Sequence, residues 1–311
     1  MKNKLTLTGA NVLFFVLTVV LLGYQFVASI LFGDIFIRNP YYVLMINQVL
    51  IGSFAAVYCI LNRIDIRETF RIRKLEIAPA LLIVLLAVPL YLGAVMLNGI
   101  VIYGLQFIAE LPKQTLPALE TPSDLAVGIA IVAVMPGICE ELLHRGLLLT
   151  AYERRGSYRA VVIVAVLFGL IHFDITNLAG PVLLGLVFGY YVVRTGSIFA
   201  GILAHFLNNL IAELIQYFWA DQSSSERLML TGQELLGFIA VGIPALAVAA
   251  VLLHLFRGVT EGKTEIIPPI SRPGQDLKTV AGHWPVAAVV SIYAVLMIMT
   301  LFVMMATKFA I

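Results

Sequence analysis

Long apolar runs separated by short polar loops make up most of this sequence, and they restrict the folds open to it. About 20 apolar residues form a helix that crosses a bilayer. Nine apolar runs cover residues 9–32, 41–61, 78–107, 125–152, 159–173, 179–194, 197–218, 236–256 and 284–307. With 61% of its residues hydrophobic and 12% charged, the chain cannot supply the polar surface of a soluble domain. We therefore predict an all-α, polytopic bundle of about eight or nine membrane segments, with 1–311 as a single integral membrane domain.

Three of these runs call for comment. The run 9–32 is too long for the core of a signal peptide and no small-residue cleavage site follows it, so we expect it to be retained as the first helix. The runs 159–173 and 179–194 are shorter than a full crossing needs. Backbone polar groups at membrane depth must be satisfied within the protein or by a water-filled cavity. We therefore expect other helices to enclose these two runs, with their connecting turn buried or lining a cavity.

The distribution of lysine and arginine predicts how the chain crosses the membrane. With the N-terminus in the cytoplasm, fifteen of the 20 basic residues fall in loops on that side, as the positive-inside rule requires. Arg145 stays within the bilayer, and the four on the other side are Arg38, Lys113, Arg227 and Lys308. No organelle address is evident, so the expected location is the cytoplasmic membrane of a bacterium.

The loops add two expectations. Residues 257–283 should form a cytoplasmic loop, which Pro268-Pro269 and Pro273-Gly274 make irregular and mobile. The net charge of +2 and the absence of a basic face argue against a nucleic-acid partner.

The run 125–152 contains charges that oppose its insertion into a membrane. Each of Glu140, Glu141 and Arg145 costs roughly 2.5 to 3.5 kcal/mol at mid-bilayer before any pairing. Residues four apart share a helix face, so Glu141 should form an ion pair with Arg145. Glu140 is then left beside His144 as a candidate general base. The alternative is a buried polar pair that only fixes helix packing.

A few more polar side chains lie deep in other apolar runs. His172 ends one run, while His205, Asn209 and Glu213 follow each other at intervals of four and share one helix face. Counted from the predicted cytoplasmic boundaries, Glu140, His172 and His205 lie roughly 12 to 20 Å deep at 1.5 Å per residue. They can therefore meet in one buried polar cavity, with the parts needed to activate a water and stabilise an oxyanion. For Glu213 we expect only a partnership with a neighbouring polar group.

These residues resemble the motifs of the CPBP family, the CAAX-processing and bacteriocin-processing membrane proteases, also described as the Abi family. The family's three motifs are Glu-Glu-x-x-x-Arg, Phe-x-x-x-His and His-x-x-x-Asn or Asp. They correspond here to Glu140, Glu141 and Arg145, to Phe168 and His172, and to His205 and Asn209. Each motif alone is weak, but their order and separations fit. The resemblance covers about residues 120–218, which we take as a CPBP-like catalytic core.

The resemblance implies a glutamate-dependent intramembrane endopeptidase. By this analogy Glu140, helped by His172, deprotonates the attacking water, and His205 with Asn209 stabilises the oxyanion. The residues expected to support this site are Glu141, Arg145, Phe168 and His144. The expected partners are the lipid bilayer and a membrane-associated or lipidated peptide or protein that serves as substrate.

Other interpretations stay open at this point. Within the family, Glu140, His172 and His205 could instead hold a zinc ion. We favour no metal and no other cofactor, because Asn209 is a poor zinc ligand and a good oxyanion donor. Outside proteolysis, the alternatives are a non-catalytic scaffold or bacteriocin-immunity protein of the same fold, or an ion- or proton-coupled transporter. The sequence does not identify the substrate.

Overall fold

The computed structural model is all-helical and describes residues 4–111, 117–219 and 229–309. Its long helices are α1 (Leu7–Arg38), α2 (Tyr41–Leu61), α4 (Ile77–Leu105), α10 (Ile198–Trp219), α11 (Gly232–Val259) and α13 (Trp284–Phe309). A further continuous helical segment combines α5 (Pro122–Gly128), η1 (Ile129–Val134), α6 (Met135–Glu141), η2 (Leu142–Leu148) and α7 (Leu149–Tyr152). The shorter elements are α3 (Ile66–Thr69), η3 (Glu153–Arg155), α8 (Ser157–Leu170), α9 (Ala179–Thr195) and α12 (Pro273–Ala281).

The helices confirm the predicted membrane protein. Within the described residues, seven helical segments are long and apolar enough to cross a membrane, and α8 and α9 are shorter apolar helices. Each of the nine apolar runs of the sequence corresponds to one of these segments. The chain is therefore an integral membrane protein built as a polytopic helix bundle.

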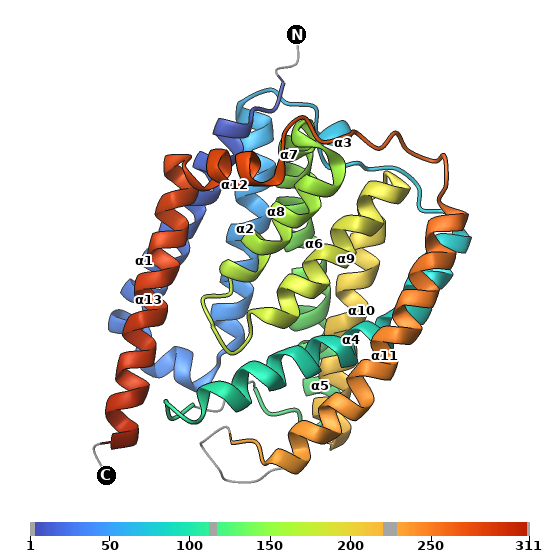
Figure 1. Ribbon diagram of the computed structural model, residues 1–311. Helices are drawn as coiled ribbons and strands as arrows, with labels where there is room; N and C mark the ends of the chain where they lie inside the picture. The colour runs from blue at the N-terminus through green and yellow to red at the C-terminus, as the bar shows by residue number, and fades with distance from the viewer. Residues whose placement is uncertain (1–3, 112–116, 220–228, 310–311) are drawn as a thin grey trace.

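The helices pack so that the motif-bearing segments lie inside the bundle (Figure 1). Helices α1, α2 and α13 form one side, where α1 contacts both of the others. Helix α11 packs along α4 on the opposite side. Between these two walls lie α6, α8, α9 and α10, and α6 contacts both α2 and α10. The three motifs therefore sit on neighbouring central helices.

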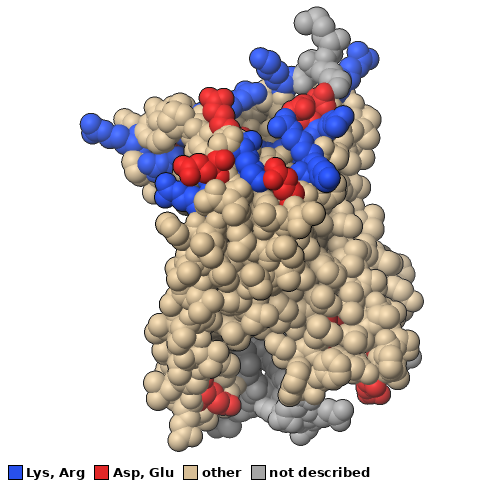
Figure 2. All heavy atoms as spheres, turned by 90° about the vertical axis from the view of Figure 1, so that its right-hand side faces the viewer, with Lys and Arg blue, Asp and Glu red and all other residues tan. Residues whose placement is uncertain are grey.

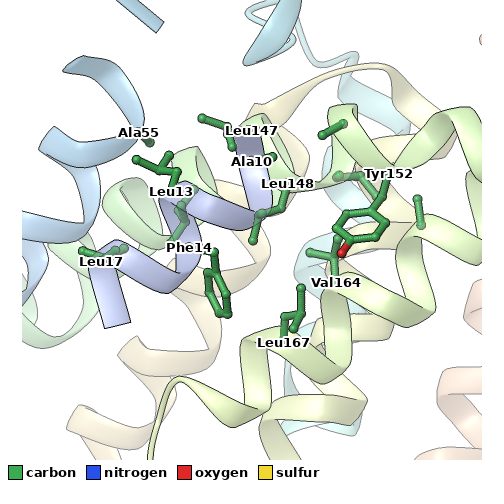
Figure 3. Packing of buried hydrophobic residues seen from close by; sticks show 14 of the residues in the cluster. Ala10, Leu13, Phe14, Leu17, Ala55, Leu147, Leu148, Tyr152, Val164 and Leu167 are labelled. Atoms are coloured by element: carbon green, nitrogen blue, oxygen red, sulfur yellow. The ribbon is translucent and has the colours of Figure 1, made fainter. Parts of the chain in front are cut away.

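A buried apolar cluster holds the C-terminal half of the composite segment against α1 and α8. Figure 3 shows Ala10 and Phe14 of α1 near Leu148, and Val164 of α8 beside Tyr152. Each of these side chains is at most 2% exposed. Inside a membrane such packing stabilises the bundle through van der Waals contacts. This packing fixes the helix that carries the first motif.

The short helices α8 and α9 form a hairpin whose turn ends inside the bundle. The connecting residues 171–178 are partly buried, and His172 and Asn177 of this turn line an internal cavity. This confirms the expectation that the turn lines a cavity, where its polar groups escape lipid.

Charged side chains gather at one end of the molecule (Figure 2). This is the end that carries the start of α1 together with α3 and α12, whereas the middle of the face shown is almost free of charge. The arrangement follows the loop charges on which the sidedness prediction rests. The side chain of Arg38, and all of Lys2, Lys113 and Arg227, lie outside the described residues, and the orientation itself stays a prediction.

The prediction of an irregular segment over 257–283 was wrong in part. Residues 273–281 form α12, in which Pro273 occupies the first turn, a position where a proline's missing N–H costs no hydrogen bond. Asp276 anchors this helix by accepting hydrogen bonds from Arg155 Nε at 2.6 Å and from Ser271 Oγ at 2.7 Å. The Ser271 hydroxyl, followed by the Arg155 guanidinium, holds the pKa of the Asp276 carboxyl below its ordinary value.

Candidate active site

Two π-helical stretches flank the helix that carries the first motif. They are η1 before α6 and η2 directly after Glu141, and such wide turns often mark functional sites. Pro136 lies between them and has no N–H to return an α-helical bond to the carbonyl of Val132. Asn209 of α10 donates to that carbonyl instead, from Nδ2 at 2.8 Å. The third motif is thereby joined to the helix of the first.

A cavity of about 360 Å³ lies between α2, α4, α6, α9 and α10. Its wall contains all four residues predicted as catalytic: Glu140, His172, His205 and Asn209. Phe168 also lines it, whereas Glu141, His144 and Arg145 are not part of its lining. The three motifs therefore face one space, which is the main geometric expectation from the sequence.

Glu140 is buried at the cavity wall and only partly satisfied. Its residue is 8% exposed, and Oε1 accepts a hydrogen bond from Gln48 Nε2 at 2.8 Å. Oε2 is buried and receives no hydrogen bond from the described residues. His205 Nε2 lies 3.9 Å from this oxygen. One carboxylate oxygen is thus held in place while the other remains available.

Glu141 and Arg145 form the predicted ion pair. Arg145 Nη1 donates to Glu141 Oε1 at 2.6 Å, and both side chains are fully buried. The guanidinium also donates to the Gly185 carbonyl at 3.2 Å and lies 4.4 Å from the centre of the Phe168 ring, a cation–π distance. A Cβ on Gly201 would lie 2.4 Å from Glu141 Oε2, so this glycine leaves the space that the carboxylate occupies.

His205 connects the two glutamates. Its Nδ1 lies 3.0 Å from Glu141 Oε1, and because an ionised carboxylate only accepts, the imidazole donates in this bond. Its other nitrogen, Nε2, then points toward Glu140 Oε2 across 3.9 Å. The Glu141 and Arg145 pair thus orients a histidine that faces the cavity.

His172 is oriented by its own helix. Its Nδ1–H donates to the Phe168 carbonyl at 2.8 Å, which leaves Nε2 with a lone pair in the neutral ring. The Phe168 ring contacts the imidazoles of His144, His172 and His205 edge to face, with centroids 5.0 to 5.6 Å apart. Phe173, which follows His172 in the sequence, has a φ of 49°, an unfavourable conformation for an aromatic residue. Phe168 therefore acts as the packing support for the histidines.

Asn209 keeps one donor free for chemistry. Besides its bond to Val132, its Oδ1 accepts from Asn208 Nδ2 at 3.1 Å. An amide nitrogen carries two hydrogens, and the described hydrogen bonds use only one of them. These two hydrogen bonds fix the orientation of the amide, and the second hydrogen on Nδ2 remains without a partner among the described residues.

The predicted pairing of Glu140 with His144 was wrong. His144 is fully buried and its Nδ1–H donates at 2.8 Å to the backbone carbonyl of Glu140, not to the carboxylate. Its ring packs between Phe14 and Phe168. The backbone hydrogen bond and the packing between the two rings hold the imidazole in this position. His144 therefore contacts the site from behind the cavity wall.

Glu213 lies apart from His205 and Asn209, although all three residues are on α10. It is 2% exposed but does not line the cavity. Its Oε2 lies against Gly128, close to the Tyr41 hydroxyl. No catalytic part is assigned to it by this position.

The residues considered for zinc do not converge as a ligand set. Within the described ranges, no three His, Cys, Asp or Glu side chains come together in a way that could hold a metal ion. His172 Nδ1 and His205 Nδ1 donate to the Phe168 carbonyl and the Glu141 carboxylate, which leaves both Nε2 atoms facing the cavity. These bonds are compatible with either interpretation, and independence from metal stays a prediction.

Four carboxamides in the cavity wall had no assigned part in the sequence analysis: Gln48, Asn98, Asn177 and Asn208. Asn98 of α4 joins the turn to α9, because its Nδ2 donates to Asn177 Oδ1 at 2.8 Å while its Oδ1 accepts from the Gly180 N–H at 2.7 Å. Gln48 and Asn98 interrupt otherwise apolar runs. Isolated amides in apolar runs were the sequence signal that could have identified these two residues as part of the site.

Comparison with known proteins gives two matches over this region. Residues 122–211 match the family described as "Type II CAAX prenyl endopeptidase Rce1-like". The Bacillus subtilis (strain 168) protein "Putative membrane peptidase YdiL" is 25% identical over 140 residues, which are 43% of this chain and 57% of that protein. The alignment thus spans just over half of the relative's length, and no solved structure matches the chain. These matches agree with the CPBP motifs: the segment 122–211 is similar to the Rce1-like endopeptidases, over the region that carries all three motifs.

Proposed function

We propose that this protein is an intramembrane endopeptidase that hydrolyses a peptide bond of a membrane-associated protein with a glutamate-activated water. The observation that carries the proposal is the shared cavity of Glu140, His172, His205 and Asn209 within a membrane bundle. The Rce1-like match over the same segment supports it. The unpartnered Glu140 Oε2 is the acceptor that a general base requires.

In the first step, Glu140 Oε2 takes a proton from water while the water oxygen bonds to the substrate carbonyl carbon. The carbonyl oxygen becomes an oxyanion, which the free Asn209 N–H can stabilise. His205 Nε2 lies on the same wall and can donate to the oxyanion as well when its ring carries both protons. His172 offers its Nε2 lone pair as a second proton acceptor on the same wall.

In the second step, the tetrahedral intermediate collapses. The carbon–nitrogen bond breaks, and the proton held by Glu140 passes to the leaving amine nitrogen. Collapse yields a carboxylic acid and an amine and returns Glu140 to its ionised form. The acid then gives its proton to the amine, so the products leave as a carboxylate and an ammonium group. Glu141 and Arg145 contribute by holding His205 in position.

We further propose that the charged end of the molecule faces the cytoplasm of a bacterium. The support is the concentration of lysine and arginine at that end (Figure 2). A thiol-labelling map of single cysteines placed in the loops at either end would test this orientation.

The proteolytic proposal is tested by comparing peptide N- and C-termini in membranes from cells that carry the wild type or Glu140→Gln at equal abundance. Loss of particular termini with Glu140→Gln is the expected result, because an amide cannot accept the water proton. Glu213→Gln is the matched control, since it makes the same change in a buried glutamate outside the cavity. Identical termini in all three membranes would reject proteolysis in favour of a scaffold or transport function.

A further inference from the structure

Gln48 lies outside the segment that resembles the protease family, yet it makes the hydrogen bond that holds Glu140. It is on α2, whereas the family match begins at residue 122. The residue is 7% exposed, and its Nε2 donates to Glu140 Oε1 at 2.8 Å. The amide orientation follows from this contact, because the opposite orientation would place two acceptor oxygens against each other. Its Oε1 must therefore point away from the bound carboxylate oxygen.

The contact leaves two buried acceptors without a donor. Neither Gln48 Oε1 nor Glu140 Oε2 receives a hydrogen bond from the described residues, and both residues line the cavity. A buried acceptor without a partner is destabilising, because it has given up its hydrogen bonds to water. Water has two hydrogens to donate, and ordered water typically fills such positions when the site is polar and large enough. Both residues line a cavity of about 360 Å³, which as a whole is large enough to hold water.

We propose that Gln48 is a positioning residue that, together with Glu140, binds the attacking water. The water donates one hydrogen to Glu140 Oε2 and the other to Gln48 Oε1. This inference rests on the proposed protease function and specifies how the nucleophile is held. One carboxamide then fixes both the base, through its nitrogen, and the water, through its oxygen.

The arrangement determines which proton leaves. When the water oxygen attacks the substrate carbonyl carbon, the O–H bond directed at Glu140 breaks and that proton moves to Oε2. The hydrogen directed at Gln48 stays on the oxygen, because a neutral amide is a far weaker base than a carboxylate. The two hydrogen bonds occupy both hydrogens of the water, so a lone pair is left for the attack.

The competing explanation is that Gln48 only joins α2 to α6. Interhelical hydrogen bonds in membrane proteins stabilise helix packing only modestly, so a purely structural Gln48 would affect stability and little else. A positioning role affects turnover instead. A misplacement of about 1 Å at the reacting groups can cost on the order of 100-fold in rate.

The experiment measures cleavage by the full-length protein in proteoliposomes. The probe is a synthetic peptide that spans the cut site revealed by the comparison of termini. We expect Gln48→Leu to lower kcat by about 10- to 100-fold with KM and Tm close to wild type. Gln48→Asn, which keeps the carboxamide on a shorter side chain, should recover part of the rate.

Gln25→Leu is the matched control. Gln25 lies on the neighbouring helix α1, is exposed and does not line the cavity. It removes the same group from a membrane helix, so its kcat should equal that of the wild type.

The outcomes separate this inference from the proposed function. If the wild type cuts and Glu140→Gln does not, but Gln48→Leu turns over at the wild-type rate, only the role of Gln48 is wrong. A loss of rate in Gln48→Leu that merely follows a fall in Tm also overturns it. If the wild type cuts no peptide, the proposed function fails and this inference fails with it. An experimental density map of the wild type supplies a readout besides activity: it should contain a water between Gln48 and Glu140, and its absence would overturn the inference.

Discussion

The buried pair of Glu141 and Arg145 should show a large asymmetry between single and double substitutions. The two side chains are fully buried, and their atoms Oε1 and Nη1 lie 2.6 Å apart. Arg145→Met removes the guanidinium but leaves the Glu141 carboxylate in the bundle, with His205 as its one remaining hydrogen-bond partner among the described residues. Breaking a buried pair from one side costs about 3 to 5 kcal/mol, because the remaining charge is desolvated and unpaired. The lost cation–π contact with Phe168 adds to this cost.

The double variant Glu141→Leu/Arg145→Met removes both charges and fills the space with apolar atoms of similar volume. Its free energy of unfolding should lie closer to the wild type than that of Arg145→Met, since no desolvated charge remains. The expected coupling energy is about 1 to 3 kcal/mol. Cleavage should stay impaired in both variants. In the double variant His205 Nδ1 has lost its acceptor on Glu141. In Arg145→Met the Glu141 carboxylate that holds His205 has lost its counter-charge.

The assay is equilibrium unfolding of the four proteins of this cycle in mixed micelles with increasing SDS. Helical content gives the folded fraction, and the four free energies give the coupling term directly. If the double variant is as unstable as the sum of the two single variants, the pair is not coupled. The assignment of Arg145 as the counter-charge of Glu141 would then be wrong.

Two further predictions concern close packing and pH. Gly201→Ala should lower stability by about 1 to 3 kcal/mol and reduce cleavage, because its Cβ would lie 2.4 Å from Glu141 Oε2. The control is Gly23→Ala, whose Cβ would meet nothing within 4 Å. Thermal unfolding should show this control to be neutral or slightly stabilising. Asp276 has a lowered pKa, so its stabilisation of α12 is present above about pH 4, the ordinary carboxyl value, and is lost as pH falls through the folded-state value. Limited proteolysis near α12 should therefore increase at low pH in the wild type. In Asp276→Asn, cleavage there should be fast at neutral pH too, and unchanged susceptibility in that variant would refute the anchoring role.

The sequence predicted the helices well because hydrophobic length is a local property. The run 41–61 coincides with α2, and 284–307 falls within α13. The helix α12 was missed because Pro273-Gly274 was interpreted as a turn, although proline also suits the first turn of a helix. What decides between the two is the anchoring of Asp276 by Arg155, a contact between residues 121 positions apart.

The site was predictable to the level of its motifs but not of its contacts. The spacing of Glu141 and Arg145 gave their ion pair correctly, because residues four apart share a helix face. The same spacing did not join the side chains of Glu140 and His144, because the imidazole donates to the Glu140 backbone carbonyl and packs between Phe14 and Phe168. The partner that holds Glu140 comes from α2, and no local pattern links a lone glutamine to a carboxylate 92 positions away.

The length of α8 accounts for the position of the cavity in the bundle. At 1.5 Å per residue, its 14 residues span about 21 Å, which is less than the hydrocarbon thickness of about 30 Å. The turn that follows therefore ends within the bilayer, and its polar groups need protein partners or water. Asn98 supplies one such partner by joining the turn to α9, and the cavity beside it accepts His172. An α8 long enough to cross the membrane would carry His172 past Glu140 and leave no polar space between them, so the short hairpin is what allows water and catalytic side chains to meet at this depth.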